Sequence, residues 1–327
     1  MNALFLTLGG LLAARVVSAW LATGNKVAAL WTGDQSDGLR PDRALGLAAP
    51  SWSIASLMRR HNIPVRRNPD LKNWADGEAE IARLGADVLI TAATPQIVPE
   101  KIIGLFPGRA VNFHCAALPH YRGPHPVVGM ILDGEAERYG GVALHCLTRR
   151  IDEGDIIAFR KLPHDQARGY LHWEVSLARA AGELAGTELQ DYLKGRRGTR
   201  PQAKGAGNYR KVNREEMTLS AKQSASHVKW LCDQLGDSGW IRFRSARGKK
   251  LIVPLFLRLV GPATGEGEKI GRFTIEFDAA DAWPASCTPS GEPHAGASPR
   301  LPFEARAIRR RELARSPQRW RNSGPKP

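Results

Sequence analysis

Short apolar runs that alternate with helix-like segments restrict the fold of this sequence more than any other feature. The runs suited to buried strands are residues 3–7, 26–32, 63–67, 86–93, 110–114, 140–147 and 155–163. Helix-like segments fill the intervals, at residues 11–23, 51–61, 73–85, 97–107, 125–135 and 170–194. The run 86–93, ADVLITAA, is almost wholly apolar, which is typical of a strand covered on both faces. This alternation predicts an α/β fold with a mostly parallel sheet.

The composition changes after the last long helix-like segment, and the change predicts four parts. Residues 1–193 carry the α/β pattern, and residues 194–208 are rich in Gly, Lys and Arg, which is typical of a linker. Residues 209–282 contain one helix-like segment and several strand-like runs, so we expect a small, mostly β domain there. Residues 283–327 hold Pro, Ser, Gly and Arg with few core residues, and we expect a basic, disordered tail.

The formal net charge of +15 at pH 7 suits a polyanionic partner, but its distribution weakens that inference. Residues 1–200 carry 24 Lys and Arg against 20 Asp and Glu, a net +4. Residues 201–327 carry 23 against 12, a net +11, and nine of those basic residues lie in 300–327. Most of the excess charge therefore lies outside the α/β part, where it is weak evidence for nucleic-acid binding.

The cysteines and the N-terminus indicate a reduced, cytoplasmic protein. Four cysteines (Cys115, Cys146, Cys232 and Cys287) form no C-x-x-C pair, and no His cluster has metal-ligand spacing. We therefore predict free thiols and no metal. The apolar N-terminus lacks the basic start of a signal peptide and is interrupted by Arg15, so we expect no membrane partner. The sequence has no G-x-G-x-x-G, which leaves a dinucleotide site without support.

Two polar residues end the apolar run 110–114. Because side chains alternate along a strand, Asn112 and His114 point the same way, towards the edge where ligands of α/β sheets bind. Asp152 lies in a later loop, and if it folds beside His114 it favours the imidazolium form and raises the pKa of the ring. An amide, an imidazolium and a carboxylate suit a reaction that builds up an oxyanion and moves a proton. The alternative is that these residues are ordinary, hydrogen-bonded loop residues.

Two stretches resemble the 10-formyltetrahydrofolate-dependent formyltransferase family. They are NFHCAALPHYRGPHPVVGMILDGE, which begins at Asn112, and GGVALHCLTRRIDEGDII, which begins at Gly140. The family shares Asn-x-His, a Leu-Pro-x-x-x-Gly turn and a later Asp, which correspond to Asn112 and His114, residues 118–123, and Asp152. The resemblance is good over about residues 1–200, where it implies a Rossmann-like formyltransferase domain. It is weaker beyond, where it implies a small barrel-like domain, as in methionyl-tRNA and sugar-nucleotide formyltransferases.

The resemblance implies transfer of a formyl group from 10-formyltetrahydrofolate to a primary amine, without a metal. Asn112 and protonated His114 are expected to stabilise the formyl oxygen, while Asp152 keeps the ring charged and assists proton transfer. Pro95, which has no backbone N–H, and Ala116, where the family often has Ser, depart from its pattern. The family's folate pocket corresponds here to residues Thr94, Pro95, Gln96, Ile97, Arg149 and Ile151.

The acceptor is expected to contact His120, Arg122 and His125, although these residues also suit an exposed loop. Methionyl-tRNA formyltransferases usually carry a basic insertion after their second strand, whereas residues 33–50 here hold two Arg and three Asp. We therefore expect an acceptor that is a small-molecule amine: an amino sugar, a nucleotide-linked amine or an amino-acid derivative. Three alternatives stay open: methionyl-tRNA as acceptor, water as acceptor in a hydrolase, and a basic RNA-binding protein without activity.

Overall fold

The computed structural model describes residues 1–32, 49–67, 69–94, 96–165, 169–220, 223, 225–236, 238–244 and 250–252. They divide into two units. The first comprises Met1–Met217 and Asp233–Ser238, and the second comprises Thr218–Cys232 and the described residues from Gly239 onward. The expected tail, residues 283–327, lies outside the described residues, and the domain boundaries drawn from the sequence stay a prediction.

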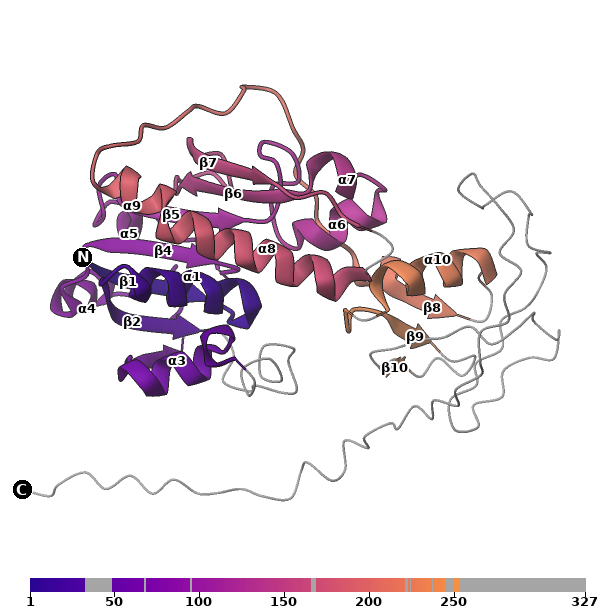
Figure 1. The fold of residues 1–327 in the computed structure, drawn as a ribbon, viewed down its shortest axis with the longest axis horizontal. Helices are drawn as coiled ribbons and strands as arrows, with labels where there is room; N and C mark the ends of the chain where they lie inside the picture. The colour runs from indigo at the N-terminus through magenta and orange to yellow at the C-terminus, as the bar shows by residue number, and fades with distance from the viewer. Residues whose placement is uncertain are drawn as a thin grey trace, which may run out of the picture. The chain divides into compact units, whose positions relative to one another are not determined.

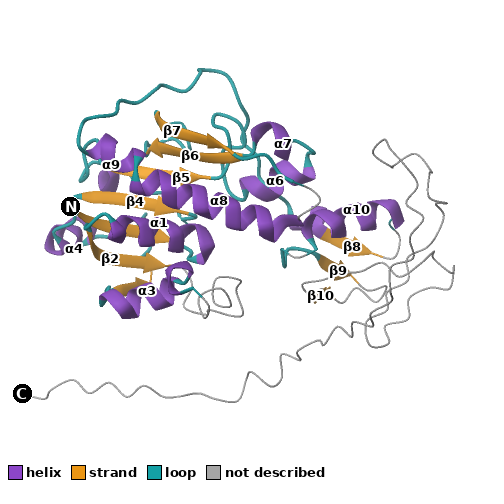
Figure 2. Cartoon of the chain, viewed as in Figure 1, coloured by secondary structure: helices purple, strands orange, loops and turns teal. Residues whose placement is uncertain are grey.

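A seven-stranded sheet forms the centre of the first unit (Figure 1; Figure 2). The strand order is β3–β2–β1–β4–β5–β6–β7. Neighbours from β3 to β5 run parallel, whereas β5–β6 and β6–β7 are antiparallel. The expected mostly parallel sheet is thus confirmed, with an antiparallel edge. The strands are β1 (Asn2–Thr7), β2 (Lys26–Thr32), β3 (Val65–Arg67), β4 (Val88–Ala92), β5 (Ala110–His114), β6 (Gly141–Cys146) and β7 (Ile156–Lys161).

Helices connect these strands and cover the sheet (Figure 1). Local signals set some of their ends: the Ser53 side chain accepts the N–H of Ser56 at the start of α3, and Asn62 ends that helix in the left-handed region. The helices are α1 (Gly10–Ala22), α3 (Ile54–His61), α4 (Gly77–Leu84), α5 (Glu100–Ile103), α6 (Pro126–Leu132), α7 (Ala136–Tyr139), α8 (Gly169–Gly186) and α9 (Glu188–Leu193).

The core lies between the sheet and its helices. All five residues of β4 are buried, as its apolar sequence predicts for a central strand. One cluster of buried side chains joins strands β1, β2 and β4 to helices α4 and α5, and it includes Leu4, Leu6, Trp31, Leu89, Ile81 and Ile102. Burial of this apolar surface is the main force that holds the sheet and helices together.

One long helix expected over residues 170–194 is instead two. The break falls at Thr187, which separates α8 from α9. The Thr187 hydroxyl donates back to the carbonyl of Glu183 at 2.9 Å, a bond by which Thr side chains bend or end helices. The expectation of one continuous helix was therefore wrong, because amphipathic spacing alone does not reveal this competing bond.

The second unit contains a three-stranded sheet. The order is β10–β9–β8, with β8–β9 parallel and β9–β10 antiparallel. The strands are β8 (Thr218–Ser220), β9 (Arg242–Arg244) and β10 (Lys250–Ile252), and the helix between β8 and β9 is α10 (Ala225–Leu235). The expected barrel-like arrangement stays a prediction. Among the described residues, no helix is long and apolar enough to cross a membrane, and no group of three or more His, Cys, Asp or Glu could hold a metal ion.

Candidate active site

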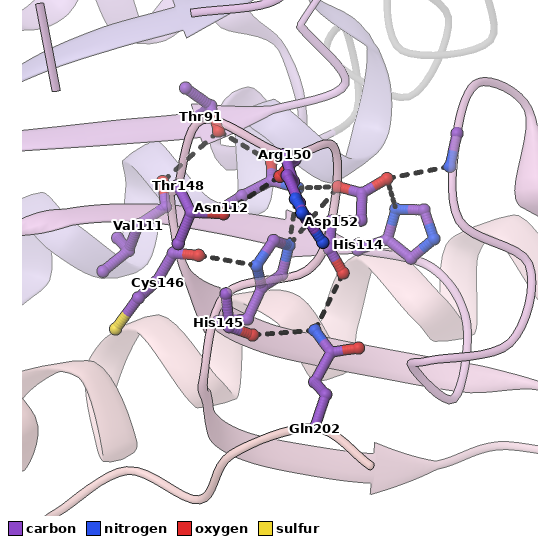
Figure 3. Close-up of polar contacts among 12 residues, drawn as sticks. Thr91, Val111, Asn112, His114, His145, Cys146, Thr148, Arg150, Asp152 and Gln202 are labelled. Carbon is purple, nitrogen blue, oxygen red and sulfur yellow. Dashed lines mark hydrogen bonds and ion pairs between the residues drawn. The ribbon is translucent and has the colours of Figure 1, made fainter. Parts of the chain in front are cut away.

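Asn112 lies at the centre of a buried polar cluster on β5 (Figure 3). Its Oδ1 accepts a hydrogen bond from the Thr91 hydroxyl on β4 at 2.7 Å, which fixes the orientation of the amide. Its Nδ2 then faces Nε2 of His145 at 3.0 Å and donates to Oδ1 of Asp152 at 3.3 Å. Both amide hydrogens of Asn112 therefore have partners within the protein.

His145 is directly opposite Asn112 in the antiparallel β5–β6 pair, and only 1% of its surface is exposed. Its Nδ1 lies 2.9 Å from the carbonyl oxygen of Cys146, which can only accept, so Nδ1 carries a hydrogen. With the hydrogen on Nδ1, Nε2 is the nitrogen that can accept from Asn112. His145 is not among the site residues predicted from the sequence; the available signal was an imidazole in an otherwise apolar strand.

His114 ends β5 and is also buried. Its Nε2 lies 2.8 Å from the carbonyl oxygen of Tyr121, so Nε2 carries a hydrogen and donates it. Its Nδ1 lies 3.5 Å from Oδ2 of Asp152. In the neutral ring this nitrogen holds the lone pair, and a proton taken up there forms an imidazolium that pairs with the carboxylate.

Asp152 reaches the cluster from the loop between β6 and β7, where its backbone has the left-handed φ of 55°. Oδ2 accepts the backbone N–H of Gly123 at 2.9 Å, and Oδ1 lies 3.5 Å from Nε2 of His145. Burial opposes ionisation, but His114, His145 and the Gly123 N–H outweigh it and hold the pKa of Asp152 well below its usual range. Asp152 is therefore a carboxylate at neutral pH.

Asp152 raises the pKa of His114, as expected from the sequence, but burial outweighs this effect and the net shift is downward. Burial lowers the pKa of His114 below its ordinary value, and the opposing effects of Asp152 and the Tyr121 carbonyl do not restore it. The physical reason is that a ring with only 6% of its surface exposed loses more solvation than one carboxylate at 3.5 Å returns. Burial therefore favours the neutral ring, in which Nδ1 can accept a proton.

Known proteins resemble this chain in sequence and in fold. Residues 48–169 match the family model described as formyl transferase. A methionyl-tRNA formyltransferase of Bdellovibrio bacteriovorus is 29% identical over 224 residues, which cover 65% of this chain and 67% of the relative. One from Listeria innocua is 34% identical over 161 residues, 48% of this chain and 50% of the relative. Residues 48–169 belong to the formyl transferase family.

Solved structures agree with this assignment at the level of the fold. A sugar N-formyltransferase from a Shewanella species has a TM-score of 0.58 at 17% identity, covering 80% of this chain and 99% of that one. A 4-N formyltransferase from Francisella tularensis has a TM-score of 0.57 at 16% identity, covering 79% of this chain and 98% of that one. The first unit is thus a Rossmann-like formyltransferase domain. The sequence alignments span only half to two thirds of the length of the two curated relatives.

The loop expected to bind folate in this formyltransferase follows β4. The Gln96 side chain is held by the backbone: it donates to the carbonyl of Pro69 at 2.7 Å and accepts the N–H of Leu71 at 3.0 Å. The Thr94 hydroxyl bonds locally to the carbonyl of Gln96 at 3.4 Å, and Ile97 is 64% exposed. Gln96 therefore shapes this loop rather than presenting free side-chain groups. Pro95 lies outside the described residues.

The second expected folate segment is the loop that carries Asp152. Arg149 is exposed, and Ile151 is 37% exposed although its side chain is apolar. The Thr148 hydroxyl donates to the carbonyl of Arg150 at 3.0 Å, which tightens the start of the loop (Figure 3). The structure thus leaves Arg149 and Ile151 accessible on either side of the turn that leads to Asp152.

The residues expected to contact the acceptor differ in their surroundings. His120 stacks on Tyr139, with ring centroids 4.1 Å apart. Arg122 donates to Glu153, the neighbour of Asp152, at 2.6 Å. His125 precedes α6 with a left-handed φ of 60°. Arg122 is therefore joined by an ion pair to the loop that carries Asp152.

Proposed function

We propose that this formyltransferase transfers the formyl group of 10-formyltetrahydrofolate to the primary amine of a small metabolite. The observation that carries the proposal is the buried cluster of Asn112, His114 and Asp152 inside a formyltransferase domain. An amide and an imidazole that both contact one carboxylate supply an oxyanion donor and a proton acceptor at one point. The catalytic roles of these residues are part of this proposal.

In the proposed reaction the amine nitrogen attacks the formyl carbon, and negative charge develops on the formyl oxygen. Asn112 Nδ2 is the donor suited to that oxygen. Because both its hydrogens have partners, the transfer needs one of them, and the 3.3 Å bond to Asp152 is longer than the 3.0 Å contact with His145. Release of the longer bond would provide a donor while the shorter one keeps the amide in place.

The amine loses a proton as the new C–N bond forms. His114 Nδ1 holds a lone pair beside the Asp152 carboxylate, so a proton accepted there produces a neutralised ion pair. The same proton can then pass to the folate nitrogen that leaves as the old C–N bond breaks. His114 thus acts through its proton-accepting nitrogen, while Asp152 stabilises the imidazolium that forms.

The proposed folate site lies over the two loops at Thr94–Ile97 and Arg149–Asp152. Ile97 and Ile151 are large apolar side chains that stay exposed, as expected for groups that cover a flat aromatic ring when it binds. Arg149 is exposed and can pair with a carboxylate of the folate glutamate. His120, Arg122 and His125 are the proposed contacts to the acceptor.

The candidate functions differ in the molecule that accepts the formyl group. The absence of a basic cluster from the sequence of residues 33–50 favours a small amine, because a protein that grips tRNA needs many phosphate contacts. Methionyl-tRNA is the second candidate, because the sequence relatives named above carry that activity in their names. The third candidate is a hydrolase, in which water replaces the amine as acceptor of the formyl group from 10-formyltetrahydrofolate.

Release of tetrahydrofolate, followed with a panel of acceptors, tests these candidates. The panel holds methionyl-tRNA, nucleotide-linked amino sugars, free amino acids and water alone. We expect release with a small amine and none with His114→Ala. Release with methionyl-tRNA that falls steeply with salt selects the second candidate. Release without any amine selects the hydrolase. No release and no binding of 5-formyltetrahydrofolate would contradict formyl transfer and favour a non-enzymatic, basic RNA-binding protein.

A further inference from the structure

The segment that follows α9 returns to the catalytic cluster and is attached to it at both ends. We call residues 200–210 the strap. At its start, Arg200 pairs with Ile156 of β7 through backbone hydrogen bonds of 2.7 and 2.8 Å. At its end, Tyr209 forms a bridge with Arg122: the Arg122 N–H donates to Asn208 and the Arg210 N–H donates to Arg122, both at 3.0 Å. The strap therefore joins the end of the sheet to the turn that follows β5.

Gln202 of the strap holds the loop that carries Asp152 (Figure 3). Its Nε2 donates to the carbonyl of Asp152 at 2.8 Å and to that of Gly154 at 2.7 Å. Asp152 has a left-handed backbone that a non-glycine residue keeps only when its surroundings enforce it. Gly154 packs so closely that an added Cβ would lie 1.8 Å from the carbonyl oxygen of Cys146. One amide group thus fixes both sides of a strained turn.

Asn208 holds the opposite loop. Its Oδ1 accepts the backbone N–H of Tyr121 at 2.8 Å, and Tyr121 also has a left-handed φ of 55°. The carbonyl of Tyr121 accepts the Nε2–H of His114 at 2.8 Å. The position of this carbonyl decides which nitrogen of His114 carries the hydrogen and how the ring faces Asp152. Asn208 therefore reaches His114 through a single intervening residue.

The strap also packs closely against the turn at residues 118–123, which follows β5. A Cβ on Gly207 would lie 2.0 Å from the carbonyl oxygen of Pro119. A Cβ on Gly123 would lie 2.6 Å from the ring of Tyr209. The N–H of Gly123 is the donor to Oδ2 of Asp152, so the contact with Tyr209 bears directly on a bond to the carboxylate. Movement of the strap would shift both loops together.

We propose that Gln202 and Asn208 are positioning residues, and that the strap sets the geometry between Asp152 and His114 by holding the two left-handed residues on either side of the cluster. The inference rests on the proposed function for its catalytic meaning. Its structural content, the orientation and tautomer of His114, can be measured without turnover. A carboxylate and a ring displaced by about 1 Å cost on the order of 10²-fold in rate in comparable sites.

Two matched substitutions test the strap. Gln202→Glu keeps the shape of the side chain but replaces the two donors with oxygens that face carbonyls. Asn208→Leu removes the acceptor for Tyr121, whereas Asn208→Asp keeps an oxygen there. We expect Gln202→Glu and Asn208→Leu to lower kcat by about 10- to 100-fold, and Asn208→Asp to stay within about threefold of the parent protein. Turnover is followed as tetrahydrofolate release with the best acceptor of the panel, or with water.

Histidine ring NMR gives the second readout. In the parent protein, the His114 ring, assigned by loss of its signals in His114→Gln, should show the tautomer protonated at Nε2. We expect its ring nitrogen shifts to move in Gln202→Glu and Asn208→Leu and to stay in Asn208→Asp. Two controls are Lys204→Ala, an exposed strap residue, and Gln190→Glu, a buried glutamine that donates to the Ala185 carbonyl at 3.0 Å away from the cluster. Both should leave the His114 signals and kcat unchanged.

The outcomes separate the strap from the proposed function. No formyl transfer by the parent protein contradicts the function, while the His114 signals still decide the strap. Parent-like kcat and unshifted His114 signals in both Gln202→Glu and Asn208→Leu would overturn the strap proposal. If Gln202→Glu does not fold, parent-like kcat and unshifted His114 signals in Asn208→Leu alone overturn the proposal, because Asn208 is exposed and its substitution leaves the core unchanged.

Discussion

Nδ2 of Asn112 lies 3.0 Å from Nε2 of His145, and the two residues are directly opposite each other in the β5–β6 pair. The Cys146 carbonyl fixes the tautomer of His145, so the ring presents an acceptor to the amide. The Thr91 hydroxyl binds the other side of the same amide. Asn112 is therefore oriented by two neighbouring strands before any substrate arrives, which is the preorganisation that oxyanion donors require.

Replacing His145 should reveal how far this orientation matters. His145→Phe leaves a buried N–H of Asn112 without its acceptor, which typically costs about 1–3 kcal/mol in the free energy of unfolding. His145→Gln can supply an amide oxygen in its place and should cost less. We also expect the rate of tetrahydrofolate release to fall further in His145→Phe than in His145→Gln. Equal rates and equal urea midpoints for the two variants would contradict the tautomer assigned here.

Thr91 offers a matched pair of substitutions on the other side of Asn112. Thr91→Val keeps the shape but removes the hydroxyl that donates to Oδ1 at 2.7 Å, whereas Thr91→Ser keeps it. We expect Thr91→Val to lose about 1–3 kcal/mol of stability and some turnover, because Oδ1 of Asn112 loses the donor that orients the amide. Thr91→Ser should retain the turnover and lose only the packing of one methyl group. Chemical unfolding and initial rates on both variants measure this difference.

The three central residues should be needed for turnover and not for folding. Asn112→Ala removes the proposed oxyanion donor and should lower kcat by about 10²- to 10³-fold. His114→Ala and Asp152→Asn remove the proton acceptor and its counter-charge, each with a loss of about 10²- to 10⁴-fold. Circular dichroism should report a folded protein in each case. If His114→Ala turned over as fast as the parent protein, this result would contradict the mechanism.

Stability should depend on pH through His114. Burial lowers the pKa of this ring in the folded protein, while in the unfolded chain a histidine titrates near ~6.5. The unfolded chain then binds more protons around that pH, so the free energy of unfolding falls as the pH is lowered through this range. His114→Gln should make the dependence less steep. Burial also lowers the pKa values of His120 and His125, so some of the slope should persist.

Urea unfolding at pH 7.5, 6.5 and 5.5 measures this slope. Asp152 adds a separate effect at lower pH, because its pKa is held below the usual range and its stabilisation is lost only as the carboxylate becomes protonated. A slope that His114→Gln leaves unchanged between pH 7.5 and 5.5 would show that this ring is not a buried neutral histidine.

The sequence predicted much of the sheet and the central residues, for physical reasons that are visible in the result. Buried parallel strands such as β4 need continuous apolar sequence, and such runs are easy to recognise. Strand alternation correctly placed Asn112 and His114 on one face, since both now contact Asp152. The break at Thr187 depended on one side-chain bond that periodicity does not report.

The remaining partners of the site were beyond sequence reasoning because they depend on long-range pairing. His145 faces Asn112 only because β6 runs antiparallel to β5 in one particular register. Gln202 lies 50 positions after Asp152 in a Gly-, Lys- and Arg-rich segment whose composition is typical of a linker. The sign of the His114 pKa shift depended on how completely the ring is buried, and burial depth is not written in a local motif.

The strap also bears on protein engineering. Residues 48–169 suffice to recognise the family by sequence, yet Gln202 and Asn208 lie outside them. A graft or minimal fragment cut at the end of α9 would carry Asn112, His114 and Asp152 but leave Tyr121 and Asp152 without their backbone supports. A chimaera that takes its catalytic loops from this chain should therefore also take the strap, with the junction placed after residue 210.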